Sequence, residues 1–483
     1  MTQFILNNKT IKTNVSSGMT LLDFIRNQQH LKGTKTGCRE GDCGACSILV
    51  GTFQDDEMVY QSMTSCLMPL ANAAGKHIVT VEGINRELKI KNEELTPIQA
   101  AMHEESATQC GFCTVGFVMS MTGVSLAKGA IEYDDVIESI DGNICRCTGY
   151  KSIERAAERL TNLLKTRDLH GSALDFAIKN DIVPPYFAEI KNRILDIVTE
   201  PITQSLNNSI TPLIVGGGTD LYVQKHADMP HTSANHIFDN QILRGIILKD
   251  GFFEMGSAAT VSDMKTSSQL NGAFPSLQKH LKLVSSTPIR NMATIAGNLV
   301  NASPIGDMTV WFLALDATIT LADLTTFEKL SNLNTREIYL KDFYKGYKIL
   351  NKKEGEILTK IRFKNSEHGD THFNFEKVCK RTYLDIASVN TAIFLETKKD
   401  KIVRANVSMG GVSPIPLFLA KTSEFLVGKT IKQGEKVDWF DAANDILQTE
   451  ISPISDVRGT AEYKRLLARQ LFKAHFVELF SSF

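Results

Sequence analysis

The 483-residue sequence lacks the features that mark several large classes of protein. No apolar run approaches the roughly 18 residues that a membrane-spanning helix needs, so we expect no membrane association. It has no long basic run, and its 53 basic side chains balance 54 acidic ones, so nothing favours nucleic acid as a partner. The opening segment MTQFILNNKTIKTN lacks the basic-then-apolar order of a signal peptide, which predicts a cytoplasmic protein.

The common hydrolytic and phosphoryl-transfer motifs are also missing. The sequence contains no H-E-x-x-H, no Walker loop and no serine elbow. It has no internal repeat and no low-complexity tract. Its hydrophobic share of 43% is enough to bury several cores, so the length predicts three or four domains.

Cysteine is the residue that the chain distributes most unevenly. Eight of the nine cysteines lie in the first third of the sequence, and only Cys379 stands far downstream. Disulfides are rare in cytosolic proteins, so clustered thiols are more typical of a metal site. Cys379, which lies in a predicted strand, is expected to be an ordinary half-buried thiol.

The first group of cysteines is Cys38-x4-Cys43-x2-Cys46, followed by Cys66. This is the plant-type [2Fe–2S] spacing, in which a tight loop wraps the cluster. The interleaved glycines let backbone N–H groups turn toward the sulfur atoms and tune the potential. A structural zinc site is the alternative, although such sites more often use two short C-x2–4-C pairs.

The second group joins Cys110-x2-Cys113 to Cys145-x-Cys147. Two close pairs, one from each of two loops, can meet around one metal centre. The spacing alone leaves zinc open as an alternative. A redox dithiol in CGFC is a further alternative, but it leaves the second pair unexplained.

Hydrophobic periodicity predicts the organisation around these cysteines. Residues 1–88 are predicted as a small α/β unit, with a strand in QFILNNKTI and a helix in MTLLDFIRNQQHL. Residues 89–165 are predicted as four helices: TPIQAAMHEES, VGFVMSMTGVSLA, EYDDVIESI and KSIERAAERLTNLL. A polar, irregular linker is expected over 166–190, mixed strands and helices to 365, and strands followed by a long helix after that.

Two glycine-containing segments suggest a bound polar cofactor. Consecutive glycines in PLIVGGGTDLYVQ can form an anion-binding nest for a pyrophosphate, although alone they are more typical of a plain turn. The segment does not fit the G-x-G-x-x-G dinucleotide motif. TPIRNMATIAGNLVNASPIGD, at 287–307, places small hydrogen-bonding residues between apolar stretches. Its alternative interpretation is an ordered turn in which Asp307 caps a helix.

These motifs together resemble one family. GTKTGCREGDCGACSILV, SCLMPL, QCGFCTVGFVMSM and GNICRCTGYKSI are similar to the paired [2Fe–2S] domains of the molybdenum hydroxylases, which include xanthine dehydrogenase. The glycine segments are similar to the FAD domain of that family. The resemblance implies a multidomain α+β protein with a β-grasp ferredoxin domain (1–88), a four-helix [2Fe–2S] domain (89–165), a linker (166–190), an α+β FAD-binding domain (191–365) and a C-terminal α/β flavoprotein domain (366–483).

The resemblance also implies which residues hold the cofactors. The first cluster would be held by Cys38, Cys43, Cys46 and Cys66, and the second by Cys110, Cys113, Cys145 and Cys147. FAD would contact Leu213, Ile214, Val215, Gly216, Gly217, Gly218, Thr219, Asp220, Arg290, Thr294, Ile295, Ala296, Gly297, Asn298, Asp307, Leu358 and Lys377. No residue is assigned a catalytic acid or base role.

The function implied is that of the small electron-transfer subunit of a xanthine dehydrogenase in purine catabolism. Electrons would pass from a molybdenum centre on a large partner subunit through two [2Fe–2S] clusters to FAD and then NAD+, in a dimer of heterodimers. The stretch after residue 365 is much shorter than the molybdenum domain of the family. Two alternatives stay open: a subunit of an aldehyde or N-heterocycle hydroxylase, and a stand-alone ferredoxin-type flavoprotein reductase.

Overall fold

The computed structural model describes seven stretches of the chain: residues 1–85, 95–197, 213–323, 334–365, 370–381, 384–435 and 437–481. The predicted boundaries at 88/89 and 365/366 fall outside these residues or at their edge. The described residues form two compact units. The first unit draws on Met1–Asn207, Pro212–Phe238 and Ser286–Ala293, and the second on Asn208–Thr211, Asp239–Ser285 and Thr294–Phe483.

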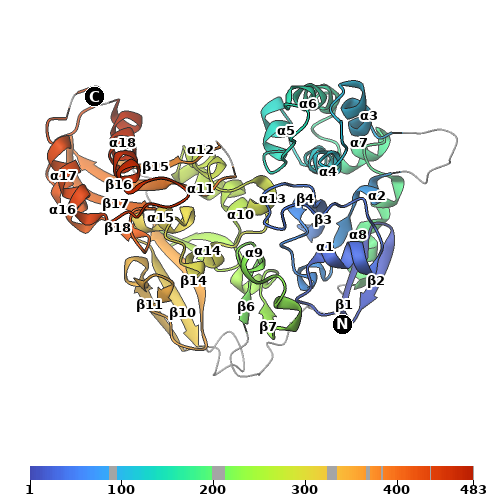
Figure 1. The fold of residues 1–483 in the computed structure, drawn as a ribbon, viewed down its shortest axis with the longest axis horizontal. Coiled ribbons are helices and arrows are strands. Elements are labelled where there is room, and N and C mark those ends of the chain that lie inside the picture. Colours follow the sequence, from blue (N-terminus) through green and yellow to red (C-terminus); the bar gives the residue numbers. More distant parts are fainter. Residues whose placement is uncertain are drawn as a thin grey trace. The chain divides into compact units, whose positions relative to one another are not determined.

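The first unit begins with a five-stranded sheet in the order β2-β1-β5-β3-β4 (Figure 1). Its strands are β1 (Thr2–Leu6), β2 (Lys9–Thr13), β3 (Ser47–Gln54), β4 (Glu57–Thr64) and β5 (His77–Val79). β1 and β5 are parallel, and the other pairs are antiparallel. The single strand predicted in QFILNNKTI is wrong: Asn7 has a φ of 52°, and the chain turns back there into a hairpin. The long first helix is also shorter than predicted, comprising α1 (Leu21–Asp23), a π-helical turn at Phe24–Gln28 and no more.

The four helices predicted after the sheet are all present. They are α3 (Pro97–Glu104), α4 (Thr114–Ser125), α5 (Tyr133–Ser139) and α6 (Lys151–Leu164). The hydroxyl of Thr96 accepts the amide of Gln99, and the Gln99 side chain accepts the amide of Thr96, which makes the capping box that starts α3. α4 is buried along almost its whole length and packs on β3 and β4. The two cysteine-containing loops of the helical region therefore lead into α4 and α6, of which α4 is buried.

The irregular linker predicted over 166–190 is wrong in its local structure. This stretch contains α7 (Ala173–Lys179) and a 3-10 turn at Pro185–Glu189, and it leads into α8 (Ile190–Ile197). The Ser172 hydroxyl caps α7 by accepting the amide of Asp175. Ile182, Val183 and Phe187 are fully buried against the helices. About half of the residues in this stretch are apolar, so its predicted polar character is also wrong.

The rest of the first unit packs against the five-stranded sheet. It contains a short α2 (Val81–Ile84), α9 (Leu221–Lys225), α13 (Thr287–Arg290) and two parallel strands, β6 (Leu213–Val215) and β7 (Ala234–His236). Val215, Tyr222 and Met292 join Phe4 and Leu22 in one buried core. The segment that carries the three glycines is thus fixed to the same core as the first group of cysteines.

The second unit contains two sheets. The first sheet has the order β11-β10-β14-β9-β8, and the second has the order β15-β16-β17-β18, with a small hairpin beside the first. Their strands are β8 (Ile246–Lys249), β9 (Phe252–Gly256), β10 (Thr318–Asp323), β11 (Thr335–Tyr339), β12 (Tyr344–Gly346), β13 (Ile349–Leu350), β14 (Glu356–Lys364), β15 (Thr371–Val378), β16 (Val389–Lys398), β17 (Lys401–Gly410) and β18 (Leu417–Phe418). The helices are α10 (Val261–Thr266), α11 (Ser268–Ala273), α12 (Leu277–Lys282), α14 (Ile295–Asn301), α15 (Asp307–Ala314), α16 (Ala420–Leu426), α17 (Phe440–Glu450) and α18 (Ala461–Phe480).

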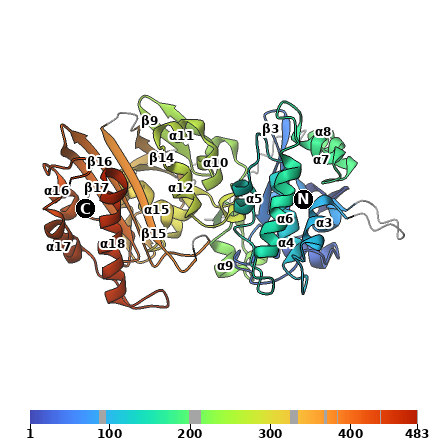
Figure 2. The same cartoon turned by 90° about the horizontal axis from the view of Figure 1, so that it is seen from above.

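The second sheet of this unit is covered on both faces. Because side chains alternate along a strand, Val389, Ile393 and Leu395 of β16 point to one face, where they join the core under α16, α17 and α18. Asn390 points to the other face, on the side of α15. Figure 2 shows the long α18 lying along β15 and β16. Among the described residues, no helix is both long and apolar enough to cross a membrane.

Candidate functional site

Three cysteines of the first group lie in the loop that precedes β3, and the fourth, Cys66, follows β4. Arg39, Gly41 and Gly44 of this loop have positive φ angles, which fold the chain into successive tight turns. The turns direct amide groups at sulfur: the amide of Cys38 lies 3.5 Å from Cys43 Sγ, and that of Glu40 lies 3.4 Å from Cys38 Sγ. Such N–H···S contacts stabilise thiolates and bound clusters.

The four sulfur atoms of this group are arranged in two pairs. A hydrogen bond with Cys43 lowers the pKa of Cys38 to about 5 and raises the pKa of Cys43. In the same way, a hydrogen bond between Cys46 and Cys66 lowers the pKa of Cys46 and raises that of Cys66. Each pair therefore has its two sulfurs close together.

The second group is also arranged in two pairs. Cys147 Sγ lies 3.7 Å from Cys110 Sγ, and both residues are exposed. Cys113 is hydrogen-bonded to Cys145, and burial is the main cause that raises the pKa of Cys113 to about 12. For Cys145, burial opposes ionisation, but the hydroxyl and amide of Thr148 donate to its sulfur at 3.1 and 3.4 Å and help to lower its pKa.

This pairwise arrangement fits two dinuclear clusters. Two thiolates on one tetrahedral metal, with metal–sulfur bonds of about 2.3 Å, have sulfur atoms about 3.7 Å apart. A [2Fe–2S] cluster held by four cysteines takes two such pairs, one on each iron. All nine cysteines are free thiols. Among the described residues, no group of three or more Cys, His, Asp or Glu side chains is arranged to hold a single metal ion.

The three glycines after β6 lie in the first unit, against backbone. A Cβ atom at Gly217 would lie 1.7 Å from the carbonyl oxygen of Met292, and one at Gly218, whose φ is +87°, would lie 2.7 Å from the carbonyl oxygen of Leu67. The Gly216 carbonyl accepts a hydrogen bond from Asn72. Two of the three glycines are thus required by close packing, and the loop they form is held rigidly.

Arg290 is placed differently from the other predicted FAD residues of the first unit. Its side chain is 1% exposed and donates to Asp141 Oδ2 at 2.7 Å and Glu138 Oε1 at 3.1 Å. The amide of Thr287 also donates to Asp141, at 2.7 Å. The guanidinium therefore fixes α13 to the end of α5, so one of the residues predicted to contact FAD bonds instead to the helical region.

The predicted run from Thr294 to Asn298 lies in the second unit, at the start of α14. The Thr294 hydroxyl caps this helix by accepting the amide of Gly297, at 3.3 Å. The Asn298 side chain accepts the amide of Thr309 at 3.2 Å and so joins α14 to α15. Ile295 and Ala296 are buried.

Asp307 and Lys377, both predicted, meet in a buried ion pair of the second unit. Lys377 Nζ donates to Asp307 Oδ2 and to the carbonyl of Leu283, each at 2.7 Å. Asn390 Nδ2 donates to Asp307 Oδ1 at 2.6 Å, while Asn390 Oδ1 is buried with no partner in the described part of the chain. A buried acceptor left unpaired fits a site that a polar ligand or an ordered water completes. Leu358 is buried in β14, opposite Leu321 of β10.

The structure thus brings Asp307 and Lys377 into contact. The predicted residues 213–220 and Arg290 lie in the first unit, and the remaining predicted FAD residues lie in the second. It adds several polar residues that the sequence did not single out. Asn390 lies near the start of β16, before the apolar run 392–395, and no pattern in the sequence indicates it. Asp141 and Asn143 lie just before the CRC motif, and no spacing rule links either to its partner.

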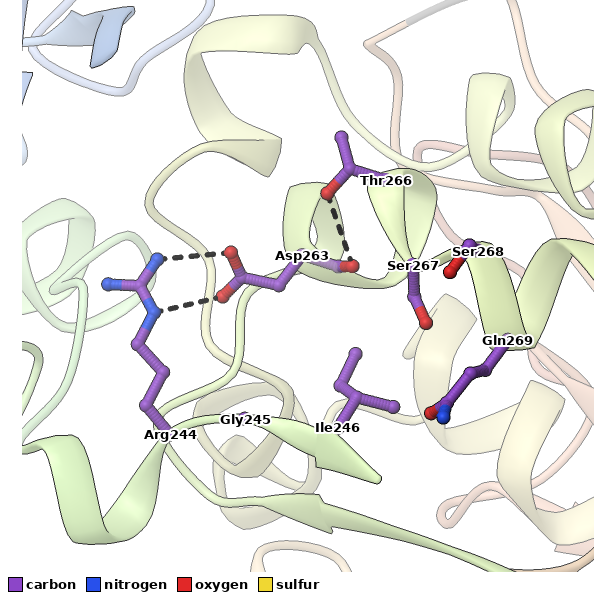
Figure 3. Close-up of a pocket in the computed structure, with 8 residues that line it drawn as sticks. All are labelled: Arg244, Gly245, Ile246, Asp263, Thr266, Ser267, Ser268 and Gln269. Carbon is purple, nitrogen blue, oxygen red and sulfur yellow. Dashed lines mark hydrogen bonds and ion pairs between the residues drawn. The ribbon is translucent and has the colours of Figure 1, made fainter. Parts of the chain in front are cut away.

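A surface pocket lies elsewhere in the second unit (Figure 3). Its lining residues are Arg244, Gly245, Ile246, Asp263, Thr266, Ser267, Ser268 and Gln269. The Arg244 guanidinium donates twice to the Asp263 carboxylate, at 3.1 and 3.2 Å, so its charge is already neutralised. None of the predicted site residues is among those that line it, and we assign it no function.

Four family models match the chain in order. They are the 2Fe-2S iron-sulfur cluster binding domain (residues 4–71), the [2Fe-2S] binding domain (80–158), the FAD binding domain in molybdopterin dehydrogenase (199–363) and the CO dehydrogenase flavoprotein C-terminal domain (375–479). The chain belongs to the molybdenum hydroxylase family. It carries two [2Fe–2S] domains and an FAD-binding domain of this family.

Curated relatives are similar to this molybdenum hydroxylase chain over most of its length. A xanthine dehydrogenase of Emericella nidulans is 28% identical over 88% of this chain and 35% of its own length. Xanthine dehydrogenase 1 of Arabidopsis thaliana is 26% identical over 95% of this chain and 38% of its own length. Aldehyde oxidase 2 of Macaca fascicularis is 26% identical over 99% of this chain and 39% of its own length. The chain therefore spans less than half of these relatives.

Solved structures of similar proteins cover little more than half of the chain. A Cu,Mo-CO dehydrogenase shares 25% identity over 55% of this chain and 88% of its own chain, with a TM-score of 0.48. Quinoline 2-oxidoreductase from Pseudomonas putida 86 shares 22% identity over 58% of this chain and 92% of its own, with a TM-score of 0.49.

Proposed function

We propose that this chain is the electron-transfer part of a xanthine dehydrogenase, receiving electrons from a molybdenum centre on a large partner subunit and passing them to FAD and then NAD+. The observation that carries the proposal is the pairwise arrangement of eight cysteine sulfurs in one unit, on a chain that also has an FAD-binding domain. Iron–sulfur clusters carry single electrons, whereas a flavin can exchange both single electrons and a hydride.

We propose that each group of four cysteines holds one cluster. Cys38 with Cys43 and Cys46 with Cys66 would supply the two pairs of the first, and the amides of Cys38 and Glu40 would keep those sulfurs anionic. The second cluster would be held by Cys110 with Cys147 and Cys113 with Cys145. The work of the protein is to fix these sulfurs and tune their potentials, and no side chain needs to move a proton during purine hydroxylation.

The exposed cysteine pair gives the place where an electron donor would approach. Cys110 and Cys147 are both exposed, and the neighbouring aromatic rings of Phe112 and Tyr150 are 46% and 39% exposed. The other candidate ligands are buried or half-buried. We therefore propose that the partner carrying the molybdenum cofactor contacts this face.

For FAD we propose the residues given by the resemblance, with different roles for their side chains. In the first unit, Gly217 and Gly218 would present a rigid backbone. In the second unit, Asp307 and Lys377 would provide polar groups that are largely buried. Arg290 stays in the proposed set, but its guanidinium already has acidic partners. Its contribution would be to hold α13 in place.

Metal and flavin analysis of the anaerobically purified chain tests this proposal. We expect about four iron atoms and one FAD per chain, and two distinct EPR signals on reduction. Zinc in place of iron, or a colourless protein, would refute it. The similarity to aldehyde oxidase favours a second candidate, in which the partner oxidises aldehydes. Assaying the complex with xanthine and with aldehydes separates the two, and assaying it with NAD+ and with O2 identifies the acceptor.

A further inference from the structure

The two cysteine-bearing loops of the first unit are joined directly by hydrogen bonds. The amide of Ile144 donates to the carbonyl of Cys43 at 3.1 Å. Beside it, Asn143 Nδ2 donates to the carbonyl of Gly44 at 3.2 Å. Cys43 is a candidate ligand of the first cluster, and Ile144 immediately precedes Cys145, a candidate ligand of the second. We call the contact formed by residues 43–44 and 143–144 the loop junction.

Asn143 is the side chain that closes this junction. Both ends of its amide are used, because its Oδ1 accepts the hydroxyl of Ser120 at 2.8 Å while its Nδ2 donates to Gly44. Asn143 is 5% exposed and Ser120, on α4, is 1% exposed. A carboxylate of the same shape could accept from Ser120, but it would place a second acceptor against the Gly44 carbonyl. Asparagine is therefore suited to connect the two loops and α4 at once.

Two glycines show how closely the backbones approach at this point. A Cβ atom at Gly44 would lie 2.3 Å from Asn143 Nδ2, and one at Gly116, on α4, would lie 2.2 Å from the Gly44 carbonyl oxygen. Either atom would force the loops apart. The junction thus leaves no room for a side chain between the two loops, and a shift of one loop must move the other.

We propose that Asn143 is a positioning residue that locks the two cysteine-bearing loops in one register and so fixes the separation of the two clusters. This inference rests on the proposed function only for the identity of the clusters. The hydrogen bonds that set the register are all made by residues of this chain. It follows that the two iron–sulfur domains are mechanically coupled, and that a change at Asn143 reaches both sets of sulfur atoms.

The test compares Asn143→Asp with Asn180→Asp, which makes the same chemical change at an amide on the end of α7, where Asn180 donates to the Phe176 carbonyl. In reduced protein, Asn143→Asp should alter the EPR spin–spin splitting between the clusters, whereas Asn180→Asp should leave it unchanged. Hydrogen exchange of the Ile144 amide should become about tenfold faster, the effect of losing one supporting hydrogen bond.

Each outcome decides the proposal. Unchanged splitting and unchanged exchange in Asn143→Asp would overturn it. Loss of the second cluster with the spectrum of the first unaltered would also overturn it, because the two loops would then respond independently. Altered spectra of both clusters would support it. Hydrogen exchange of the Ile144 amide tests the loop junction even in a chain that holds no iron. Failure of the proposed function can therefore be distinguished from failure of this inference.

Discussion

Replacing Arg290 with methionine should destabilise the contact between α13 and the end of α5. The substitution keeps the apolar stem but removes the positive charge that Asp141 and Glu138 share. The Asp141 side chain is 3% exposed, so its carboxylate would be left buried without a cation. Removing one partner of a buried ion pair costs about 3–5 kcal/mol. We expect Arg290→Met to fall in this range, whereas Arg290→Met combined with Asp141→Asn should recover much of it.

The cost should depend on pH in a defined direction. Burial is the main cause that raises the pKa of Asp141 above 3.8, and Arg290 opposes this rise. Without Arg290 the pKa of Asp141 must rise further, so the folded variant binds a proton that the unfolded chain releases above pH 4. Stability of the variant is then retained below that pH and lost as pH rises through the folded pKa. The difference from wild type should therefore be greatest at neutral pH and shrink toward pH 5.

Hydrogen exchange is the suitable assay, because a chain with two units need not unfold in one step. Amides in residues 286–293 and 138–145 should exchange faster in Arg290→Met, and those in α18 should not change. Lys151→Met is the matched control, since Lys151 pairs with Glu154 at an exposed site and its removal should leave exchange unaffected. Equal exchange in Arg290→Met and wild type at pH 7.5 would refute the view that this ion pair holds α13.

Three further predictions test other parts of the chain. Thr148→Val should make the midpoint potential of the second cluster more negative, because it removes a donor to a candidate ligand sulfur, whereas Thr148→Ser and the first cluster should be unaffected in redox-EPR titrations. Gly217→Ala should destabilise the first unit by about 3 kcal/mol or more in urea titrations, whereas Gly272→Ala, where no atom lies within 4 Å, should be tolerated. Burial lowers the pKa of His475 to about 3, so below pH 6.5 the unfolded chain takes up a proton that the native chain does not. This histidine alone should lower stability by about 1.4 kcal/mol per pH unit as pH drops from 6.5 toward 3, so the slope should be one proton shallower in His475→Gln.

Local sequence signals predicted the helical region well and the connecting segments poorly. The start of α3 followed from Thr96 and Pro97, because a capping hydroxyl and a proline act within one turn. The apolar run of α4 was long enough to identify a buried helix. In contrast, residues 166–190 were predicted as a polar linker although about half of them are apolar, and Ile182, Val183 and Phe187 pack into a core made by distant residues. Tertiary contacts of this kind leave almost no trace in local periodicity.

The candidate site could be predicted where the chemistry of a cluster sets the sequence spacing of its ligands. It could not be predicted where residues far apart in the sequence only touch in the fold. The spacing of Cys38, Cys43 and Cys46 follows from the size of the cluster that a loop must surround. The pairing of Asp141 with Arg290 joins residues almost 150 positions apart, and no rule of spacing relates them. The same is true of Asn143 and Gly44. Polar contacts between loops were therefore the part of the site that required the structure.

The placement of Asp307 shows how hydrogen bonds from a sheet can fix a residue that is predicted to contact FAD. Asp307 is the first residue of α15, and two residues of β17 donate hydrogen bonds to carbonyl groups of that helix. Ser408 Oγ donates to Val310 at 2.6 Å, and Asn406 Nδ2 donates to Ala314, the last residue of the helix, at 2.9 Å. An apolar layer would bury as much surface but would let the helix slide, since apolar packing is not directional. Hydrogen bonds in the middle and at the C-terminal end of α15 fix its axial position and, with Lys377, that of the Asp307 carboxylate.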